Sequence, residues 1–415
     1  MNTIHTRRLA ALATTALLIA ATGCSTRASD DEGSSSTQDG VKVGRGIDGT
    51  TITLGSLTDL TGPFAALGKD FTNAQALYWK TLNEGDKICG TYTVEEEVKD
   101  HGYDTQKGIQ LYSSISEDVL AIEQTIGSPI NAGLFEQLDR DKMVNIPGAW
   151  AQALTADEQN AVVGATYEVE MINVLNYLLD EGKIEEGGTL GHIYFEGEYG
   201  EGGLGGSEYF AEQHDMKLVK VQIAPTDTDM TAAVTKLAAE NVDAIAITTG
   251  PTQTASIAGV AAASGLDVPL VGNNPVYFPG LLDTPAGPAL EKNLTVASPV
   301  AGFDKFPAYF ESYSEAYDGD PTLGVMFGFA AADVMRQILE KACEDGDLTP
   351  EGVTAAKLSI GTIDTGGIAV PVTFQKDTSS SDSIFLYQPA KGPGGAVTVG
   401  DGPYTSADAA AFMGE

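Results

Sequence analysis

The chain has 415 residues, of which 42% are hydrophobic, and its 58 acidic and 23 basic side chains give a formal net charge of −35. A surface this negative repels phosphate backbones and anionic lipid headgroups, so nucleic acid is excluded as a partner and a basic patch is excluded as a membrane anchor. The length is more than one hydrophobic core usually serves, so we expect two lobes.

The first 23 residues are typical of a lipoprotein signal peptide. Arg7 and Arg8 precede an apolar run, 9–21, that is too short to span the roughly 30 Å hydrocarbon core of a bilayer as a helix. The run ends in Ala21-Thr22-Gly23-Cys24, which resembles the bacterial lipobox, whose cysteine is acylated. Ordinary secretion with an incidental cysteine is the alternative. Both hypotheses predict export, and lipidation of Cys24 would anchor the chain at the outer face of the cell membrane.

The segment after Cys24 does not have the composition of a folded region. Residues 25–40 are mostly Ser, Thr, Asp, Glu, Gly and Gln, which bury too little apolar surface to fold. We therefore expect a disordered tether over 24–49, between the signal peptide 1–23 and the folded part of the chain.

Two cysteines remain besides Cys24. Cys89 lies just beyond the first long helical pattern, and Cys343 lies at the end of a late one. In an oxidising compartment an isolated pair is typical of a disulfide, which we favour over the alternative of two buried thiols.

Short apolar or β-branched runs alternate with helical patterns along the chain. In the first series the expected strands are 51–55, 94–98, 119–124 and 144–146, and the expected helices are 69–83 and 105–116. In the second series the expected strands are 190–195, 218–223, 242–248 and 269–272, and the expected helices are 167–180, 205–214, 230–240 and 254–264. The alternation predicts an α/β fold of two doubly wound parallel-sheet lobes, whose ligands bind beyond the carboxyl ends of the strands.

Three stretches carry a resemblance to a known family. They are Gly55–Gly68 (GSLTDLTGPFAALG), Asp100–Asp104 (DHGYD) and the segment 226–245, in which a helix leads into a buried strand. In this order and at these separations they resemble the type I periplasmic binding proteins of ABC transporters, in the branch that binds the branched-chain amino acids Leu, Ile and Val. The resemblance covers about residues 50–388.

The resemblance implies a Venus flytrap, in which two lobes joined by three crossings close on a small ligand and the closed form docks on an ABC permease. It divides the chain into lobe 1, residues 50–163 and 300–366, and lobe 2, residues 164–299 and 367–415. The crossings fall near 162–165, 296–300 and 366–371. A helix expected over 327–343 then belongs to lobe 1, close to the helix that ends before Cys89, which supports the disulfide.

Loops that follow strands are the expected binding site, because a chain that leaves a strand for a helix offers unpaired N–H groups at a positive helix terminus. By the resemblance, the loops 127–131 and 147–150 hold the ligand's carboxylate in lobe 1. Lobe 2 contributes Tyr199, the strand end at 249–250 and the loop 272–275. The ligand-binding residues predicted in this way are Leu67, Ser128, Asn131, Ala149, Trp150, Tyr199, Gly250 and Asn274.

Two departures from the family's pattern leave the ligand open. Trp150 replaces the Ser or Thr hydroxyl that amino-acid binders usually have, and Asn274 replaces the acidic partner that they often offer to the α-ammonium group. An unpaired ammonium in a desolvated cleft costs several kcal/mol, so these departures argue against an ordinary α-amino acid unless Glu196, Glu198 or Glu201 supplies the charge. An aromatic wall and an amide suit an uncharged, amide-bearing or partly aromatic ligand.

The remaining motifs do not indicate chemistry. The pattern Gly200-x-Gly202-x-x-Gly205 fits a dinucleotide fingerprint, but the next strand ends without the acidic residue that such sites need, so no cofactor is expected. His101, His192 and His214 are scattered over different elements, so no metal site is expected. No serine lies in a G-x-S-x-G elbow, so we expect no catalytic residues and no enzyme.

The sequence therefore predicts a lipid-anchored, extracytoplasmic, monomeric solute-binding protein. It would capture an amino acid or another small polar metabolite in the cleft between the lobes and deliver it to the permease subunits of an ABC importer. The alternative is a sensory module that binds a similar ligand and signals to a membrane receptor. A third hypothesis, an exported α/β hydrolase, has no nucleophile to support it.

Overall fold

The structure is a computed structural model that describes residues 36–38 and 40–414. The predicted signal peptide and the predicted lipidation site, Cys24, lie outside these residues. Within them, no helix is both long enough and apolar enough to cross a membrane.

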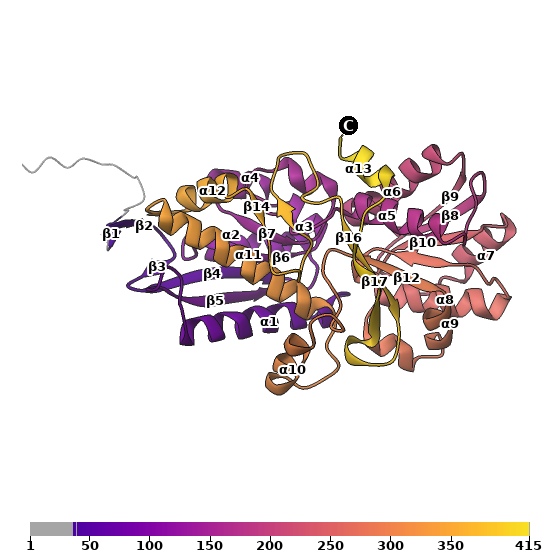
Figure 1. Cartoon of the computed structure of the whole chain (residues 1–415), viewed down its shortest axis with the longest axis horizontal. Helices are drawn as coiled ribbons and strands as arrows, with labels where there is room; N and C mark the ends of the chain where they lie inside the picture. Colours follow the sequence, from indigo (N-terminus) through magenta and orange to yellow (C-terminus); the bar gives the residue numbers. More distant parts are fainter. Residues whose placement is uncertain (1–35, 39, 415) are drawn as a thin grey trace, which may run out of the picture. The chain divides into compact units, whose positions relative to one another are not determined.

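Lobe 1 is built on a five-stranded sheet. Every pair of neighbouring strands is parallel, except that β3 is antiparallel to β4. The strands are β3 (Ile47–Asp48), β4 (Thr51–Thr58), β5 (Thr93–Asp100), β6 (Ala121–Ile126) and β7 (Asn145–Gly148). On one face of the sheet lie two long helices side by side, α1 (Ala65–Glu84) and α11 (Gly324–Glu344) (Figure 1). The other face is covered by α2 (Thr105–Ile115), α3 (Ser128–Ala132) and α4 (Phe135–Asp141).

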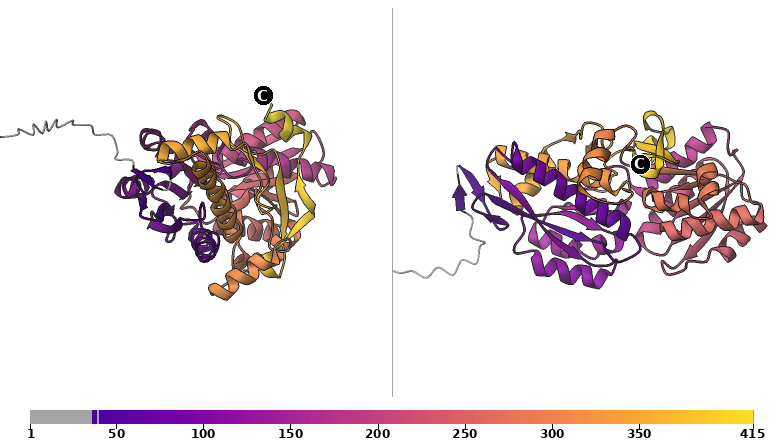
Figure 2. Two further views of the ribbon diagram at one scale, coloured as in Figure 1. Left: turned by 60° about the vertical axis from the view of Figure 1, so that its left-hand side comes forward. Right: turned by 90° about the horizontal axis from the view of Figure 1, so that it is seen from below.

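Lobe 2 is built on a seven-stranded sheet in the order β17-β16-β12-β11-β10-β8-β9. Its parallel strands are β8 (Thr189–Phe195), β9 (Lys217–Ile223), β10 (Ala244–Thr248), β11 (Leu270–Gly272) and β12 (Leu294–Ser298). An antiparallel edge is added by β16 (Ile384–Pro389) and β17 (Ala396–Tyr404). Figure 2 shows from two further sides that this last part of the chain, coloured yellow, lies against the lobe formed by the middle of the chain. The two sheets confirm the predicted fold class.

Helices cover both faces of the lobe 2 sheet, because alternate side chains of β10 pack against helices on opposite faces. Ala244 and Ala246 pack toward α5 (Tyr167–Asp180), α6 (Glu198–Gln213) and α13 (Ala407–Phe412). Ile245 and Ile247 pack toward α7 (Thr231–Ala239), α8 (Pro251–Ser264) and α9 (Gly287–Asn293). Both sets are fully buried, as expected for a central parallel strand.

The N-terminal half of α6 is not predicted from the sequence, because glycine is frequent there and disfavours helices. The structure shows why these positions are glycines. A Cβ on Gly200 would collide with the Phe195 carbonyl, and a Cβ on Gly206 would collide with the Glu168 carbonyl. The glycines therefore let α6 lie directly against β8 and α5, and this packing accounts for the glycine pattern.

Short strands form within residues 36–38 and 41–48, so the expectation of a disordered tether over 24–49 is wrong for these residues. β1 (Ser36–Gln38) pairs antiparallel with β2 (Val41–Val43), and β2 pairs in parallel with β13 (Asp347–Leu348), which follows α11. Val43 is buried in lobe 1, and the Lys42 ammonium lies 3.6 Å from the Asp347 carboxylate. The local composition does not predict these strands, because β2 pairs with β13, which comes from a distant part of the sequence of lobe 1.

A disulfide joins Cys89 to Cys343, as expected, with a Cα–Cα distance of 6.3 Å. It ties the loop after α1 to the C-terminal end of α11. The bond therefore reinforces the contact between the two long helices of lobe 1.

The second and third expected crossings are hydrogen-bonded to each other, and a residue beyond the third crossing is bonded to the first. Val300 forms a β-bridge with Ala369, and the segment that follows this bridge reaches the first crossing, where the Ser380 hydroxyl donates to the Val162 carbonyl. Their function as hinges, and the predicted lobe boundaries, stay predictions.

Candidate ligand-binding site

A small cavity lies between the two lobes. On the lobe 1 side it begins where β6 and β7 end, and on the lobe 2 side it meets the first turns of α5 and α6. This is the position expected for ligands of parallel sheets. Its lining residues are Phe64, Leu67, Tyr103, Ile126, Gly127, Ser128, Gly148, Trp150, Tyr167, Tyr199 and Pro275.

Five of the eleven lining residues of the cavity are aromatic, and rings from the two lobes meet there. The centroid of the Phe64 ring lies 5.0 Å from that of Tyr103 and 6.2 Å from that of Tyr199, and Tyr199 lies 4.8 Å from Tyr167. Phe64 is presented by a tight turn that the Asp59 carboxylate holds, since one of its oxygens accepts the Phe64 N–H at 2.9 Å. Lobe 1 thus places its rings rigidly against those of lobe 2.

The polar atoms of two of these rings are already bonded to the protein. The Trp150 indole N–H donates to the Val163 carbonyl at 2.8 Å, and the Tyr199 hydroxyl donates to the Thr249 carbonyl at 3.0 Å. Neither donor is free for a ligand, so both side chains offer mainly apolar ring surface to the cavity.

Ser128 contributes a buried hydroxyl to the cavity wall. Its side chain is only 1% exposed, and its hydroxyl finds no hydrogen-bond partner among the described residues. An unsatisfied buried hydroxyl costs about 1–3 kcal/mol, so a polar atom of a ligand that reached it would gain a hydrogen bond that the protein does not supply. The preceding Gly127 has φ +98°, a conformation that favours glycine, and turns the chain from β6 into α3.

Four of the predicted ligand-binding residues, Leu67, Ser128, Trp150 and Tyr199, line the cavity together. The other four do not line it. Asn131 donates to the Thr125 and Gly127 carbonyls at 2.8 Å, Asn274 donates to Glu170 at 2.9 Å, Ala149 is fully buried, and Gly250 precedes α8. The amide side chains of Asn131 and Asn274 turn inward because buried backbone and carboxylate oxygens need donors there.

Three lining aromatic residues, Phe64, Tyr103 and Tyr167, were not among the predicted ligand-binding residues. The first two lie inside the stretches that carry the family resemblance, after a Gly-Pro and a His-Gly pair, and an aromatic residue beside such turns is the signal that could have identified them. Tyr167 begins a helix that the sequence predicts correctly, but the helical pattern does not say that its first residue faces the cleft.

A buried polar network supports the lobe 2 side of the cavity. The Glu170 carboxyl accepts hydrogen bonds from the side-chain amides of Asn273 at 3.0 Å and Asn274 at 2.9 Å. The Asn273 oxygen accepts from the Thr248 hydroxyl at 2.8 Å, and Thr248 is bonded in turn to His192 at 3.0 Å. Burial raises the pKa of Glu170 to about 8 and lowers that of His192 to about 3. Glu170 therefore lies behind Asn274, with both oxygens engaged by amides.

Among the described residues, the lining of the cavity contains no acidic or basic side chain. Glu196 and Glu198 line an adjoining hollow that shares Tyr103 and Tyr199 with the cavity, and Glu201 is exposed on α6. The cavity itself therefore offers mainly apolar surface, together with the hydroxyl groups of Ser128, Tyr103 and Tyr167, which suits a ligand with an apolar body and a polar head group.

Comparison with known proteins agrees with this architecture. The family model described as periplasmic binding protein matches residues 51–393. Among solved structures, a fatty acid ABC transporter substrate-binding protein from Thermomonospora curvata is 40% identical, with a TM-score of 0.87 over 91% of this chain and 98% of that chain.

Two more distant structures share the fold. A branched chain amino acid ABC transporter from Thermus thermophilus with bound valine is 18% identical, with a TM-score of 0.77 over 89% of this chain and 100% of that chain. A solute binding protein from R. palustris in complex with benzoate is 18% identical, with a TM-score of 0.70 over 86% of this chain and 98% of that chain. No curated protein matches. The chain therefore belongs to the type I periplasmic binding protein family, as its sequence motifs predict.

Proposed function

We propose that this protein is the extracytoplasmic solute-binding component of an ABC importer and that it captures a small organic acid with an apolar body. The observation that carries the proposal is the cavity between the lobes, whose walls are mainly aromatic and aliphatic, contain no charged side chain and include the unpartnered Ser128 hydroxyl. Similarity to a fatty acid ABC transporter substrate-binding protein supports it.

The energetics of the cavity favour an apolar acid over an α-amino acid. Apolar ligand surface that leaves water gains about 25 cal/mol per Å², and ring and methyl groups line most of this cavity. An ammonium group would lose its hydration there without meeting a carboxylate, because both oxygens of Glu170 are bonded to Asn273 and Asn274. A protonated carboxyl head carries no charge to desolvate and can bond to the Ser128 hydroxyl.

A thermal-shift experiment on the purified protein with decanoate, benzoate and valine tests the ligand class. A ligand at 100 times its Kd stabilises the folded state by about 2.7 kcal/mol, which raises Tm visibly. We expect decanoate, and more weakly benzoate, to raise Tm, and valine to leave it unchanged. A shift with valine alone would refute the proposed ligand class and support the family's amino-acid role.

We also propose that acylated Cys24 anchors the protein to the outer face of the cell membrane. The support is the lipobox-like sequence before it, which lies outside the described residues. Cys24→Ser should abolish palmitate labelling and release the protein from the membrane fraction, while the neighbouring Ser25→Ala should change neither. Retention of Cys24→Ser on the membrane would contradict the anchor.

We also propose that the protein acts as a monomer and delivers its ligand to the permease subunits of the importer. Deletion of the gene should abolish uptake of radiolabelled decanoate by whole cells, and re-expression should restore it. Unchanged uptake together with decanoate binding in vitro would favour the sensory alternative over transport.

A further inference from the structure

A chain of hydrogen-bonded, buried side chains runs through lobe 1 from α12 (Pro350–Ser359) to the ligand cavity. It starts at Lys357, which is 3% exposed, passes through Asn160 and Asn145, and ends at Asn131. Its links are Lys357 Nζ to the Asn160 carbonyl at 2.9 Å, Asn145 Nδ2 to Asn160 Oδ1 at 2.7 Å, and Asn145 Nδ2 to Asn131 Oδ1 at 2.8 Å.

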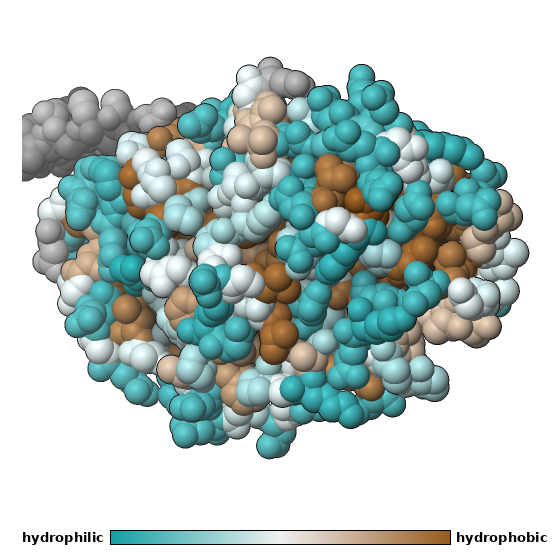
Figure 3. All heavy atoms as spheres, turned by 45° about the vertical axis from the view of Figure 1, so that its right-hand side comes forward, coloured by the Kyte–Doolittle hydropathy of each residue, from teal (hydrophilic) through white to brown (hydrophobic). Residues whose placement is uncertain are grey.

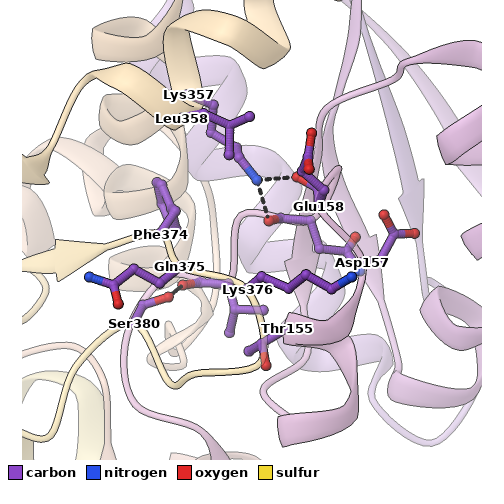
Figure 4. Close-up of a pocket in the computed structure, with 11 residues that line it drawn as sticks. Thr155, Asp157, Glu158, Lys357, Leu358, Phe374, Gln375, Lys376 and Ser380 are labelled. Atoms are coloured by element: carbon purple, nitrogen blue, oxygen red, sulfur yellow. Dashed lines mark hydrogen bonds between the residues drawn. The ribbon is translucent and has the colours of Figure 1, made fainter.

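The far end of the chain lies beside a second pocket, shown in Figure 4. There the Lys357 ammonium points at the chain segment 158–160 and donates to two carbonyls, those of Glu158 and Asn160. The ammonium therefore fixes the backbone of this segment to α12.

The near end of the chain fixes the loop that lines the ligand cavity. Asn131 Nδ2 donates to the Gly127 carbonyl and to the Thr125 carbonyl, both at 2.8 Å. These bonds hold the turn at Gly127, and the next residue, Ser128, carries the unpartnered hydroxyl. Rotation of the Asn131 amide would release the turn and move that hydroxyl.

Asn145 is the hub that prevents this rotation. Its amide group donates to Asn131 and Asn160, and its oxygen accepts from the Thr125 hydroxyl at 2.7 Å. Because the three partners lie in three different segments of the chain and are all buried, the amide has one orientation that satisfies them.

We propose that Asn145, with Lys357 at the far end of the chain, is a positioning residue for ligand binding. Neither touches the ligand; both act through Asn131 on the turn that aims the Ser128 hydroxyl. This inference rests on the proposed function, since it assumes that Ser128 binds the head group of the ligand.

Ligand affinity tests the proposal with decanoate as the probe, titrated by calorimetry. Asn145→Asp keeps the acceptor for Thr125 but loses both donors, and Lys357→Met keeps the length of the side chain but loses its N–H groups. Each variant should raise Kd at least fivefold, and the double variant should raise it by much less than the product, because both changes break one chain. Lys357→Arg, which keeps the donors, should restore most of the affinity.

Lys236→Met is the matched control. Lys236 also donates to a carbonyl, that of Lys220 at 2.9 Å, but it lies in lobe 2 away from the cavity lining. Alone, Lys236→Met should leave Kd at the wild-type value. Combined with Asn145→Asp, it should leave Kd at the value of Asn145→Asp alone. If Asn145→Asp and Lys357→Met lower stability to urea but leave Kd unchanged, the chain is only structural and the proposal is overturned.

Amide hydrogen exchange separates this proposal from the proposed function, since it needs no ligand. Asn145→Asp should speed exchange in 127–131 and leave β8, in lobe 2, unchanged. If the wild-type protein does not bind decanoate, the proposed ligand class is wrong. The positioning role is still supported if Asn145→Asp changes exchange in this way. Unchanged exchange in 127–131 overturns the positioning role.

Discussion

Residues in the cavity wall differ in whether their polar atoms are free to form a hydrogen bond with a ligand. Trp150 and Tyr199 have already donated their N–H and O–H groups to carbonyls of their own lobes, whereas the Ser128 hydroxyl has no partner in the described part of the chain. Shape and apolar contact should therefore come from the rings, and recognition of a head group should depend on Ser128.

Ser128→Ala should weaken decanoate binding about fivefold, since one hydrogen bond contributes about 1 kcal/mol. The same change should leave the stability of the ligand-free protein unchanged or raise it, because the buried hydroxyl has no partner to lose. Calorimetric titration and thermal unfolding measure the two effects. Ser113→Ala, on the exposed side of α2, is the control, and an unchanged Kd for Ser128→Ala would remove the hydroxyl from the site.

The sequence predicts which loops border the cavity, but it does not predict which of their side chains point into it. The loops at Ser128 and Trp150 follow from the strand ends and the family motifs, and both line the cavity. Asn131 and Asn274 lie in equally well predicted loops, but buried oxygens of Gly127 and Glu170 capture their amides. Sequence patterns place a residue on an element, whereas its hydrogen-bond partners come from elements far along the chain.

At the scale of secondary-structure elements, lobe 1 carries a pair of carboxyl groups that the ligand site does not use. Glu96 on β5 and Glu123 on β6 interact beneath α1, where Trp79 donates its indole N–H to Glu123 at 2.6 Å. Burial raises the pKa of Glu96 to about 7, and burial together with Glu96 raises that of Glu123 well above its usual value.

These carboxyl groups should make the protein less stable as pH rises. Their pKa values are higher in the folded state than the unfolded value of about 4.3, so the folded state binds more protons between about pH 4.3 and 7 and the free energy of unfolding falls across that window. Glu96→Gln should flatten this dependence and stabilise the protein by about 1–2 kcal/mol at pH 8.

Urea unfolding at pH 5, 6, 7 and 8 measures the effect. Glu95→Gln, exposed on the same strand, should follow the wild-type curve. A Glu96→Gln variant that is less stable than wild type at pH 8 would show that the carboxylate is needed there as an acceptor.

Helices and strands with a clear apolar period are predicted within a few residues, and α5 is predicted over its full length, 167–180. The failures have packing causes. The sequence predicts a helix only from residue 205, but the glycines before it let α6 pack against Phe195 and Glu168. The strand β2 forms because it pairs with β13, which comes from the other end of lobe 1. Neither partner can be inferred from the local sequence.

At the scale of the whole molecule, the disulfide links two parts of lobe 1 that are 254 residues apart. Removing a disulfide typically costs 2–5 kcal/mol, so Cys89→Ser, Cys343→Ser and the double variant should each lower the free energy of unfolding by about 3 kcal/mol. Because the three variants lose the same bond, their urea midpoints should coincide. A double variant as stable as wild type under oxidising conditions would contradict the bond.

The net charge of −35 should oppose the capture of an anion. Hydrophilic side chains dominate the face drawn in Figure 3, with hydrophobic ones in separate patches, and acidic groups outnumber basic ones in the chain. Salt shortens the Debye length from about 30 Å at 0.01 M to about 8 Å at 0.15 M, which screens the repulsion.

The association rate of decanoate should therefore rise several-fold over this range of ionic strength, whereas that of uncharged decanol should not change. Stopped-flow measurement of tryptophan fluorescence can follow both, since Trp150 lines the cavity. A decanoate rate that falls with salt would point to a cationic entrance that outweighs the net charge.

Calorimetric titration of the purified protein with decanoate and with valine, at two temperatures, tests the central claim most directly. We predict one decanoate per chain, bound with a negative heat-capacity change because apolar surface enters the aromatic cavity, and no heat from valine beyond dilution. Valine binding in the absence of decanoate binding would contradict an apolar organic acid as the ligand of this cleft.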